Sequence, residues 1–325
     1  MSDSYSAAFD WTVRHVDAGH LPTAVLGIST ADRIVALDAF GATDGRPAKV
    51  DDHYRLFSIT KPLIGLAAAR AVERGMLGIG TPLTDAVPEF GQGRDDVVRL
   101  RHLVSHTSGV AEPPLDAPDL AGTLRTTGRD FAVDTASRYS TLAFQGVAEL
   151  IQHSTGRAWD AAVADWADAI GADGLTLDEA SDPHQIPDAA ASGVDIEKFA
   201  ALRHPGAGLL GRAYDLLSVG SALLRDDGEI VHPATLAMMR RPLTGDIPRL
   251  EPYPAERGQD WGFTWNLRTR APSLIDRDTY GHGGWSGTEF WVHPTAGVAW
   301  VLLTNQAHRP AVNPDELDNA VISAL

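Results

Sequence analysis

Hydrophobic positions recur along the chain with two periods, one typical of helices and one typical of strands. Apolar residues line one face of a helix over residues 5–19, and two strand patterns follow at 23–28 and 33–40. A second helical pattern covers residues 58–74, and Gly75 ends it. The first part of the chain therefore predicts a helix, a hairpin and a second helix.

From about residue 80 to residue 205, short helical patterns alternate with loops rich in Pro, Gly and Asp. Strand patterns return at residues 261–267, 288–292 and 298–304, and residues 315–325 predict a closing helix. The turn at 293–297 joins the last two strands as a hairpin, so we expect them to pair antiparallel. The run 242–259 holds four prolines and is expected to be a loop that overhangs a cleft.

One sheet built from both chain ends, with a helical region inserted between them, accounts for this order of elements. We therefore expect an α/β fold of the α+β type, with an antiparallel sheet flanked by helices. The expected sheet domain is discontinuous and comprises residues 1–79 and 206–325, whereas residues 80–205 form a mostly helical inserted domain. We expect the active site in the cleft between these two domains.

Composition excludes several classes of function. The 325 residues contain no cysteine, which removes disulfides, thiolate metal sites and cysteine nucleophiles. The net charge of −16 disfavours nucleic acid and anionic membranes as partners. The first 20 residues lack the pattern of a signal peptide, and no apolar run is long enough to span a bilayer. We therefore expect a cytoplasmic protein that binds neither nucleic acid nor membrane.

Residues 57–61, with the sequence FSITK, carry the first candidate chemistry. Ser58 and Lys61 are three residues apart at the predicted start of a helix, so their side chains share one face. A neutral amine next to a serine can take its proton and make it a nucleophile, provided that burial or a nearby cation lowers the lysine pKa. A Ser-x-x-Lys spacing also occurs by chance, and on its own it more often marks a surface serine beside a solvated lysine.

Two further motifs lie in order along the chain, RYST at 138–141 and YGHGGW at 280–285, with LVSHTSG at 103–109 as a supporting segment. Together with Ser-x-x-Lys, they resemble the motifs of the serine β-lactamase and penicillin-recognising superfamily. Class C β-lactamases, DD-carboxypeptidases and the family VIII carboxylesterases of the same fold are the most similar groups. The resemblance covers nearly the whole chain and implies a hydrolase that works through an acyl-enzyme.

The resemblance assigns roles only to matching positions. It implies that Ser58 is the nucleophile, that Lys61 takes its proton or tunes its partner, and that Tyr139 passes protons to the leaving group. Whether lysine or tyrosine is the base stays open. The oxyanion hole would be the backbone N–H groups of Ser58 and Trp285, and no metal or cofactor is expected.

The resemblance also implies substrate contacts at Thr141, Gly283, Gly284 and Trp285, and a catalytic position at His282. Thr141 replaces the usual asparagine, and its hydroxyl cannot donate two amide hydrogens. His282 stands where most β-lactamases have lysine, and an ordinary imidazole is mostly neutral at pH 7. Because both changes weaken recognition of a β-lactam or a peptide terminus, we expect a carboxylesterase acting on small or medium esters.

Other functions remain open at this point. A β-lactamase, a DD-peptidase, a D-amino-acid amidase or an acyltransferase would use the same residues on a small-molecule ester or amide. A non-catalytic binding module of this fold would be expected to lack the serine, the lysine or the tyrosine, and all three are present. If neutral His282 is required, activity should rise through pH ~6–7. The oligomeric state is not predicted.

Two other patterns suggest different chemistry, and a third motif of serine hydrolases is absent. Residues 206–211 match G-x-G-x-x-G, but a helical pattern and a proline precede them where a dinucleotide site needs a strand. His102 and His106 have the i, i+4 spacing of metal ligands, without an HExxH motif. No serine has glycine on both sides at the spacing of a nucleophile elbow. We expect none of these patterns to mark the site.

Overall fold

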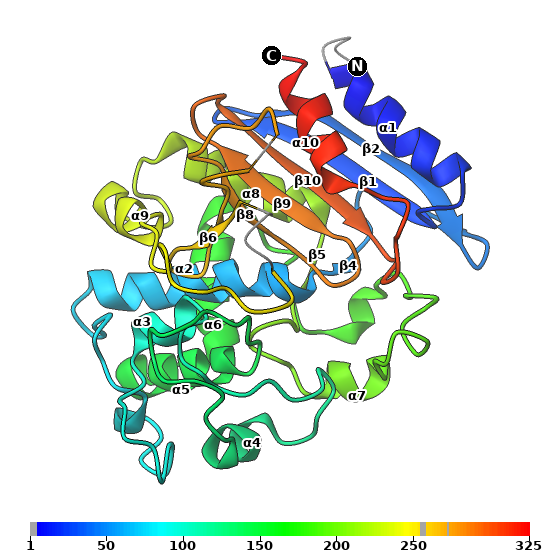
Figure 1. Ribbon diagram of the computed structural model, residues 1–325. Helices are drawn as coiled ribbons and strands as arrows, with labels where there is room; N and C mark the ends of the chain where they lie inside the picture. The colour runs from blue at the N-terminus through cyan, green and yellow to red at the C-terminus, as the bar shows by residue number, and fades with distance from the viewer. Residues whose placement is uncertain (1–4, 254–257, 272) are drawn as a thin grey trace.

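The computed structural model describes residues 5–253, 258–271 and 273–325, and it centres on an antiparallel sheet (Figure 1). The sheet has eight strands in the order β3-β2-β1-β10-β9-β8-β7-β6, so strands from both chain ends meet at its middle, where β1 pairs with β10. A separate two-stranded sheet pairs β4 with β5. The strands are β1 (Thr23–Thr30), β2 (Ile34–Thr43), β3 (Arg46–Pro47), β4 (Tyr54–Arg55), β5 (Leu210–Gly211), β6 (Asp260–Trp261), β7 (Asn266–Leu267), β8 (Tyr280–Gly283), β9 (Glu289–His293) and β10 (Val298–Thr304).

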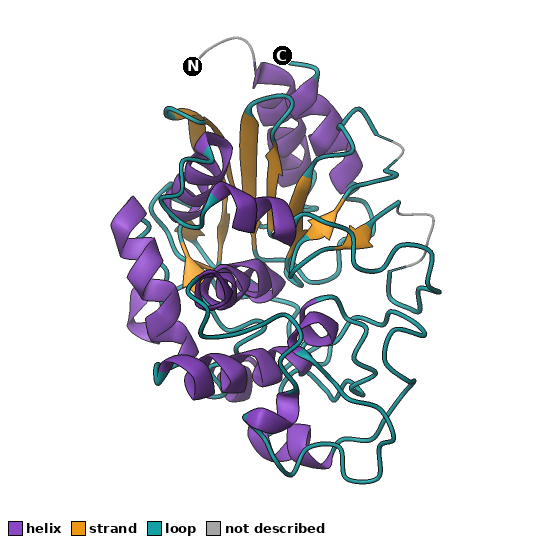
Figure 2. Ribbon diagram, turned by 90° about the vertical axis from the view of Figure 1, so that its left-hand side faces the viewer, coloured by secondary structure: helices purple, strands orange, loops and turns teal. Residues whose placement is uncertain are grey.

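Helices cover both faces of the large sheet (Figures 1 and 2). The terminal helices α1 (Ser6–Asp17) and α10 (Pro314–Ile322) pack side by side on one face, where they bury one apolar cluster. On the other face, α8 (Ala213–Arg225) packs against β1 and β10. Helix α2 (Thr60–Glu73) is buried on nearly all sides, and the helices that pack against it lie in the later parts of the chain.

The middle of the chain forms short helices joined by long loops. These elements are η3 (Leu83–Asp85), α3 (Leu100–Val104), α4 (Leu120–Thr126), α5 (Ala143–Thr155), α6 (Trp159–Ala167), η4 (Asp168–Ile170), η5 (Glu179–Ser181), α7 (Ile196–Ala201) and, later in the chain, α9 (Pro233–Met239). Helices α5 and α6 pack against α2. The expected fold class is confirmed, whereas the division into domains at residues 80 and 205 stays a prediction. Within the described residues, no helix combines the length and apolarity needed to cross a bilayer.

The predicted single strand over residues 261–267 is wrong. The segment is a tight hairpin, in which β6 pairs with β7 and Trp261 lies opposite Asn266. Thr264 adopts a positive φ of 68°, which reverses the chain. The turn is held from outside, because Phe263 N donates to Met239 O at 2.8 Å and Thr264 N donates to Val104 O at 3.0 Å. Its fold therefore depends on contacts that local periodicity does not record.

Candidate active site

Ser58 lies on a sharp bend between β4 and α2. It occupies the 3₁₀ turn η2 (Phe57–Ile59), directly before the first turn of α2. Phe57 has a φ of 43°, a left-handed conformation that is unusual for a bulky residue and is often found at functional sites. The Phe57 ring is buried and packs against Phe199 and Trp285, with ring centroids 5.1 Å apart in each case. The bend thus places Ser58 at the cavity surface while both neighbouring side chains are buried.

Lys61 is fully buried beside Ser58. Its Nζ donates to Ser58 Oγ at 3.2 Å, to Thr141 Oγ1 at 3.3 Å and to the carbonyl of Gly206 at 2.9 Å. Burial lowers the pKa of Lys61 from 10.5 to about 7, with the Glu112 carboxylate opposing this shift. A substantial fraction of the amine is therefore neutral near pH 7 and in contact with the serine hydroxyl.

The Tyr139 side chain closes the other side of this pair. Lys61 Nζ lies 4.6 Å from the centroid of the Tyr139 ring. Burial raises the pKa of Tyr139 well above 10, Tyr253 adds to this effect, and nearby Ser58 opposes it. The phenol is therefore protonated at neutral pH, which suits a group that delivers a proton.

Glu112 organises the second motif, although sequence reasoning did not single it out. Its Oε2 accepts hydrogen bonds from Ser140 Oγ at 2.8 Å, Thr141 N at 2.7 Å and Leu142 N at 3.1 Å. These donors lie at the start of α5, where a negative charge is favoured by the helix dipole. Glu112 thereby fixes the turn that carries Tyr139 and Thr141, and no local pattern around it signals this contact.

His282 lies on β8, and its position changes the expectation for this residue. It is buried, and its Nδ1 lies 2.7 Å from the carbonyl of Gly283, which can only accept, so Nδ1 carries a hydrogen. Burial, reinforced by the charge of Lys61, lowers the pKa of His282 to about 3. The imidazole is neutral at pH 7, as expected. Because this pKa lies far below pH ~6–7, we no longer expect the titration of His282 to set a rise in activity in that range.

The third motif brings its backbone against the segment before Ser58. Gly284 N donates to Thr288 O at 2.6 Å, and Thr288 Oγ1 donates to the carbonyl of Leu56 at 3.3 Å. A Cβ on Gly284 would lie 2.6 Å from that same carbonyl, so only glycine permits this approach. Within the described residues, the backbone N–H groups of Ser58 and Trp285 donate no hydrogen bond. The two expected oxyanion-hole donors therefore have no protein acceptor in the described part of the chain.

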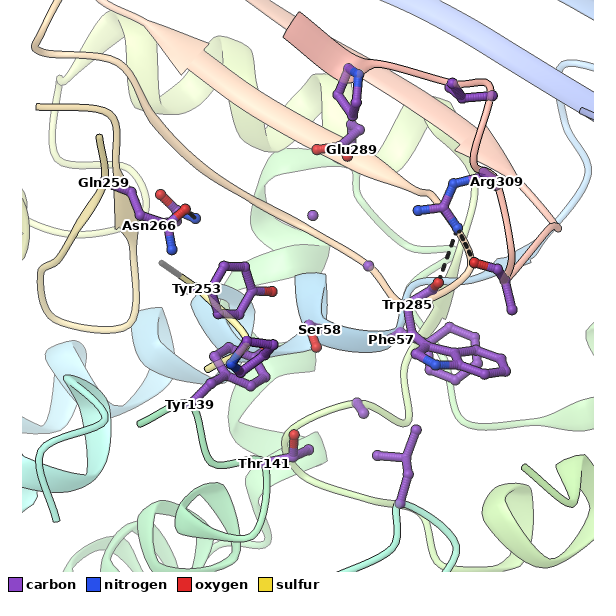
Figure 3. A pocket seen from close by; sticks show the side chains of 18 of the residues that line it. Phe57, Ser58, Tyr139, Thr141, Tyr253, Gln259, Asn266, Trp285, Glu289 and Arg309 are labelled. Carbon is purple, nitrogen blue, oxygen red and sulfur yellow. Dashed lines mark hydrogen bonds between the residues drawn. The ribbon is translucent and has the colours of Figure 1, made fainter. Parts of the chain in front are cut away.

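Arg309 supports this turn from the far side. Its Nη1 donates to the carbonyls of Trp285 at 3.2 Å and Ala307 at 2.8 Å, and it also contacts the carbonyl of Gln306. Figure 3 shows the guanidinium reaching the Trp285 carbonyl from above. Because the peptide unit of Trp285 is held through its carbonyl, Arg309 constrains the expected second residue of the oxyanion hole.

A cavity of about 780 Å³ contains Ser58, within the range of volumes of small-molecule sites. Its wall includes Tyr139, Thr141 and Trp285 (Figure 3), together with Gly283 and Gly284. Lys61 and His282 are buried and are not among the residues that line it. Other lining residues that sequence reasoning missed are Glu112, Tyr253, Gln259, Asn266, Arg268, Glu289 and Arg309. The expected loop at 242–259 contributes Pro252, Tyr253 and Gln259 to the wall, and its residues 254–257 lie outside the described part of the chain.

The residues of the two other patterns, the histidine pair and the glycine-rich run, have local partners. His102 Nδ1 accepts from Arg99 N at 3.0 Å, and His106 Nδ1 accepts from Ser140 N at 3.1 Å. His106 also packs on the ring of Tyr139, with centroids 4.4 Å apart, so it supports the second motif. The glycine-rich run at 206–211 supplies the carbonyl that holds Lys61.

Comparisons with known proteins find relatives over nearly the full length of the chain. A sequence model of the Beta-lactamase family matches residues 9–324. The chain is 28% identical to Esterase EstB of Burkholderia gladioli, over 95% of this chain and 91% of the esterase. It is 25% identical to Penicillin-binding protein 4 of Amycolatopsis lactamdurans, over 88% of this chain and 81% of that protein. The solved structure of EstCE1, a hydrolase with promiscuous acyltransferase activity, matches with a TM-score of 0.80 at 22% identity, covering 98% of both chains.

Proposed function

This chain belongs to the β-lactamase family of serine hydrolases, and from that premise we propose that it is a carboxylesterase acting on small or medium esters. The observation that carries the proposal is the contact between Ser58 Oγ and a buried amine whose pKa is lowered to about 7. Such an amine can accept the serine proton at neutral pH. The full-length similarity to Esterase EstB supports an ester as the substrate.

In the proposed acylation, Ser58 Oγ attacks the ester carbonyl while its proton passes to neutral Lys61 Nζ. The negative charge that develops on the carbonyl oxygen is stabilised by the backbone N–H groups of Ser58 and Trp285. Tyr139 delivers a proton to the departing alcohol and regains one from Lys61. Lys61 is the better candidate for the initial base, because the raised pKa of Tyr139 keeps its phenol protonated.

Deacylation reverses these transfers with water in place of the alcohol. Water attacks the acyl carbonyl, its proton is taken up by the Lys61–Tyr139 pair, and Ser58 Oγ regains a proton as the acid leaves. The cycle consumes one ester and one water and yields an acid and an alcohol. The residues named here supply every proton transfer in this sequence.

The surroundings of the nucleophile favour a neutral ester over a carboxylate-bearing lactam or peptide. Neutral His282 lies behind the cavity wall, where it provides no cation for a substrate carboxylate. Thr141 Oγ1 accepts from Lys61, so its hydroxyl has a role other than binding a substrate amide. Among the described residues, the two cations that line the cavity are engaged, since Arg268 Nη2 pairs with Asp315 at 2.9 Å and Arg309 holds backbone carbonyls.

Hydrolysis of p-nitrophenyl butyrate tests the proposal. The wild-type protein should release p-nitrophenol and form a transient butyryl adduct on Ser58, detectable by mass spectrometry after rapid quenching. Ser58→Ala should lose both, whereas Ser192→Ala, which changes an exposed serine, should lose neither. Equal rates for Ser58→Ala and the wild type would refute the assignment.

A β-lactamase or DD-peptidase activity is the second candidate, supported by the similarity to Penicillin-binding protein 4. Turnover of nitrocefin, or a stable penicilloyl adduct on Ser58, would favour it. An acyltransferase would instead lose its acyl group faster when an alcohol acceptor is added. A fluorophosphonate probe that fails to label Ser58 would favour a non-catalytic binding module.

A further inference from the structure

Two buried amide side chains lie together in the cavity wall, on the side of Tyr253 (Figure 3). Gln259 precedes β6 and Asn266 begins β7, and the hairpin between these strands brings them side by side. They are only 3% and 5% exposed. Asn266 Nδ2 donates to Gln259 Oε1 at 2.8 Å. The hairpin that the sequence did not predict thus creates a paired amide cluster in the wall of the cavity that holds Ser58.

This hydrogen bond pairs one polar group of each amide and leaves the other polar group of each amide unpaired. Within the described residues, Gln259 Nε2 and Asn266 Oδ1 are buried and have no hydrogen-bond partner. Exchanging oxygen and nitrogen in both amides would leave the same result, one unpartnered donor and one unpartnered acceptor. Buried polar groups are nearly always hydrogen-bonded in folded proteins, and leaving them unpaired is destabilising. A partner from outside the chain would remove that penalty.

The chemistry of the missing partner follows from these two atoms. A carboxylate could satisfy the donor but not the acceptor, and an ammonium group could satisfy only the acceptor. A carboxamide offers both, since its carbonyl oxygen accepts and its N–H donates, and the two groups share one carbon atom. The neighbouring acid, Asp260, is already engaged by Arg249 and by Thr244 Oγ1 at 3.1 Å, so it supplies no net charge to attract an ion.

We propose that Gln259 and Asn266 form a specificity subsite that binds a carboxamide group of the substrate, at a distance from the ester bond attacked by Ser58. This inference rests on the proposed esterase function, because both side chains line the cavity that holds the nucleophile. It narrows the substrate class to esters that carry a neutral amide elsewhere in the molecule. An analogue without the amide would leave the two buried side chains unpaired, and it would therefore have a lower kcat/KM.

Two pairs of esters, identical in shape, test the subsite on either side of the scissile bond. The acyl pair is p-nitrophenyl glutaramate and p-nitrophenyl 5-methylhexanoate, which differ by a carboxamide in place of an isopropyl group. The alcohol pair consists of the butyrates of 4-hydroxybutanamide and 4-methylpentan-1-ol. In whichever pair carries the amide on the side of the subsite, the wild type should show a kcat/KM at least about 10-fold higher for the amide-bearing ester than for its isopropyl partner. No preference in either pair would overturn the proposal.

Variants link the preference to the two residues. Gln259→Leu with Asn266→Leu removes the donor and the acceptor and should bring the ratio within about twofold of one. Gln259→Glu, which keeps the shape and replaces the donor with an acceptor, should also lose the preference, and it serves if the double variant does not fold. Gln152→Leu, an exposed amide on α5, should keep the wild-type ratio. A ratio unchanged in the subsite variants would refute the assignment.

A binding measurement separates the subsite from the esterase proposal. Hexanamide, which is not an ester, should bind the wild type at least about 10-fold more tightly than the double variant in ligand-observed NMR. If the wild type hydrolyses no ester but still binds hexanamide more tightly than the double variant, only the esterase function is refuted. Equal binding of hexanamide to both proteins would refute the subsite whether or not esters are hydrolysed.

Discussion

The lowered pKa of Lys61 predicts a pH-dependent stability that disappears when this residue is replaced. Burial brings the pKa from 10.5 to about 7 in the folded protein, whereas the unfolded chain keeps the ordinary value. Between these two pH values the unfolded chain holds one more proton than the folded protein, so stability rises with pH. Each pH unit contributes about 1.4 kcal/mol once the folded group is neutral, which gives roughly 2–3 kcal/mol between pH 7 and pH 9.

Lys61→Met isolates this contribution, because methionine keeps an unbranched apolar stem and does not titrate. All other groups titrate in both proteins, so the difference in unfolding free energy between wild type and variant should change by roughly 2–3 kcal/mol from pH 7 to pH 9, in favour of the wild type. Denaturant unfolding followed by circular dichroism at several pH values measures it. Lys198→Met is the control, since the pKa of Lys198 lies above 10.5 and this exposed group stays charged throughout. A constant difference for Lys61→Met would refute the burial argument.

Three further expectations concern catalysis. The kcat/KM for p-nitrophenyl butyrate should rise through about pH 7 as Lys61 loses its proton, and Glu112→Gln should move this rise to lower pH, because the Glu112 carboxylate raises the pKa of Lys61. Identical pH–rate profiles for the two proteins would contradict this. Arg309→Gln should lower kcat roughly 10-fold with little change in KM, because the guanidinium holds the peptide unit of the expected oxyanion-hole residue, and Arg309→Lys should recover part of the loss. A change in KM alone would argue against a positioning role. His282→Asn should leave the pH of the rise in place, because a pKa of about 3 lies far below it, and a displaced rise would show that His282 titrates.

The main strands could be predicted because the way they are buried produces a recognisable pattern of apolar residues. Strand β10 lies at the middle of the sheet and is buried on both faces, so it reads as an uninterrupted apolar run. Strand β8 escaped prediction because its four residues, Tyr280–Gly283, include two glycines and a histidine. The hairpin of β6 and β7 escaped for another reason, since its turn donates hydrogen bonds to Met239 and Val104, far away in the sequence.

Ser58 and Lys61 could be predicted because they lie in a short motif. Their spacing in the sequence places their side chains next to each other on a helix. Ser58 and Lys61 are one helical turn apart, and the structure places their polar atoms 3.2 Å apart. Glu112, Arg309 and Asn266 were missed because each acts through a partner that only the fold brings near. A carboxylate that accepts three hydrogen bonds from one turn has no signature in its own neighbourhood.

Burial determines which groups around Lys61 are protonated at neutral pH, and the type of residue alone does not. His106, His204 and His282 are all buried near Lys61, and in each case burial and the charge of Lys61 lower the pKa below its ordinary value. A positive charge on Lys61 and a positive charge on any of these rings are therefore mutually unfavourable. At pH 7 the three imidazoles are neutral, and the only one of these four groups that exchanges a proton near that pH is the amine in contact with Ser58. The buried lysine and histidines therefore create a site in which the charge near pH 7 is set by the proton on Lys61.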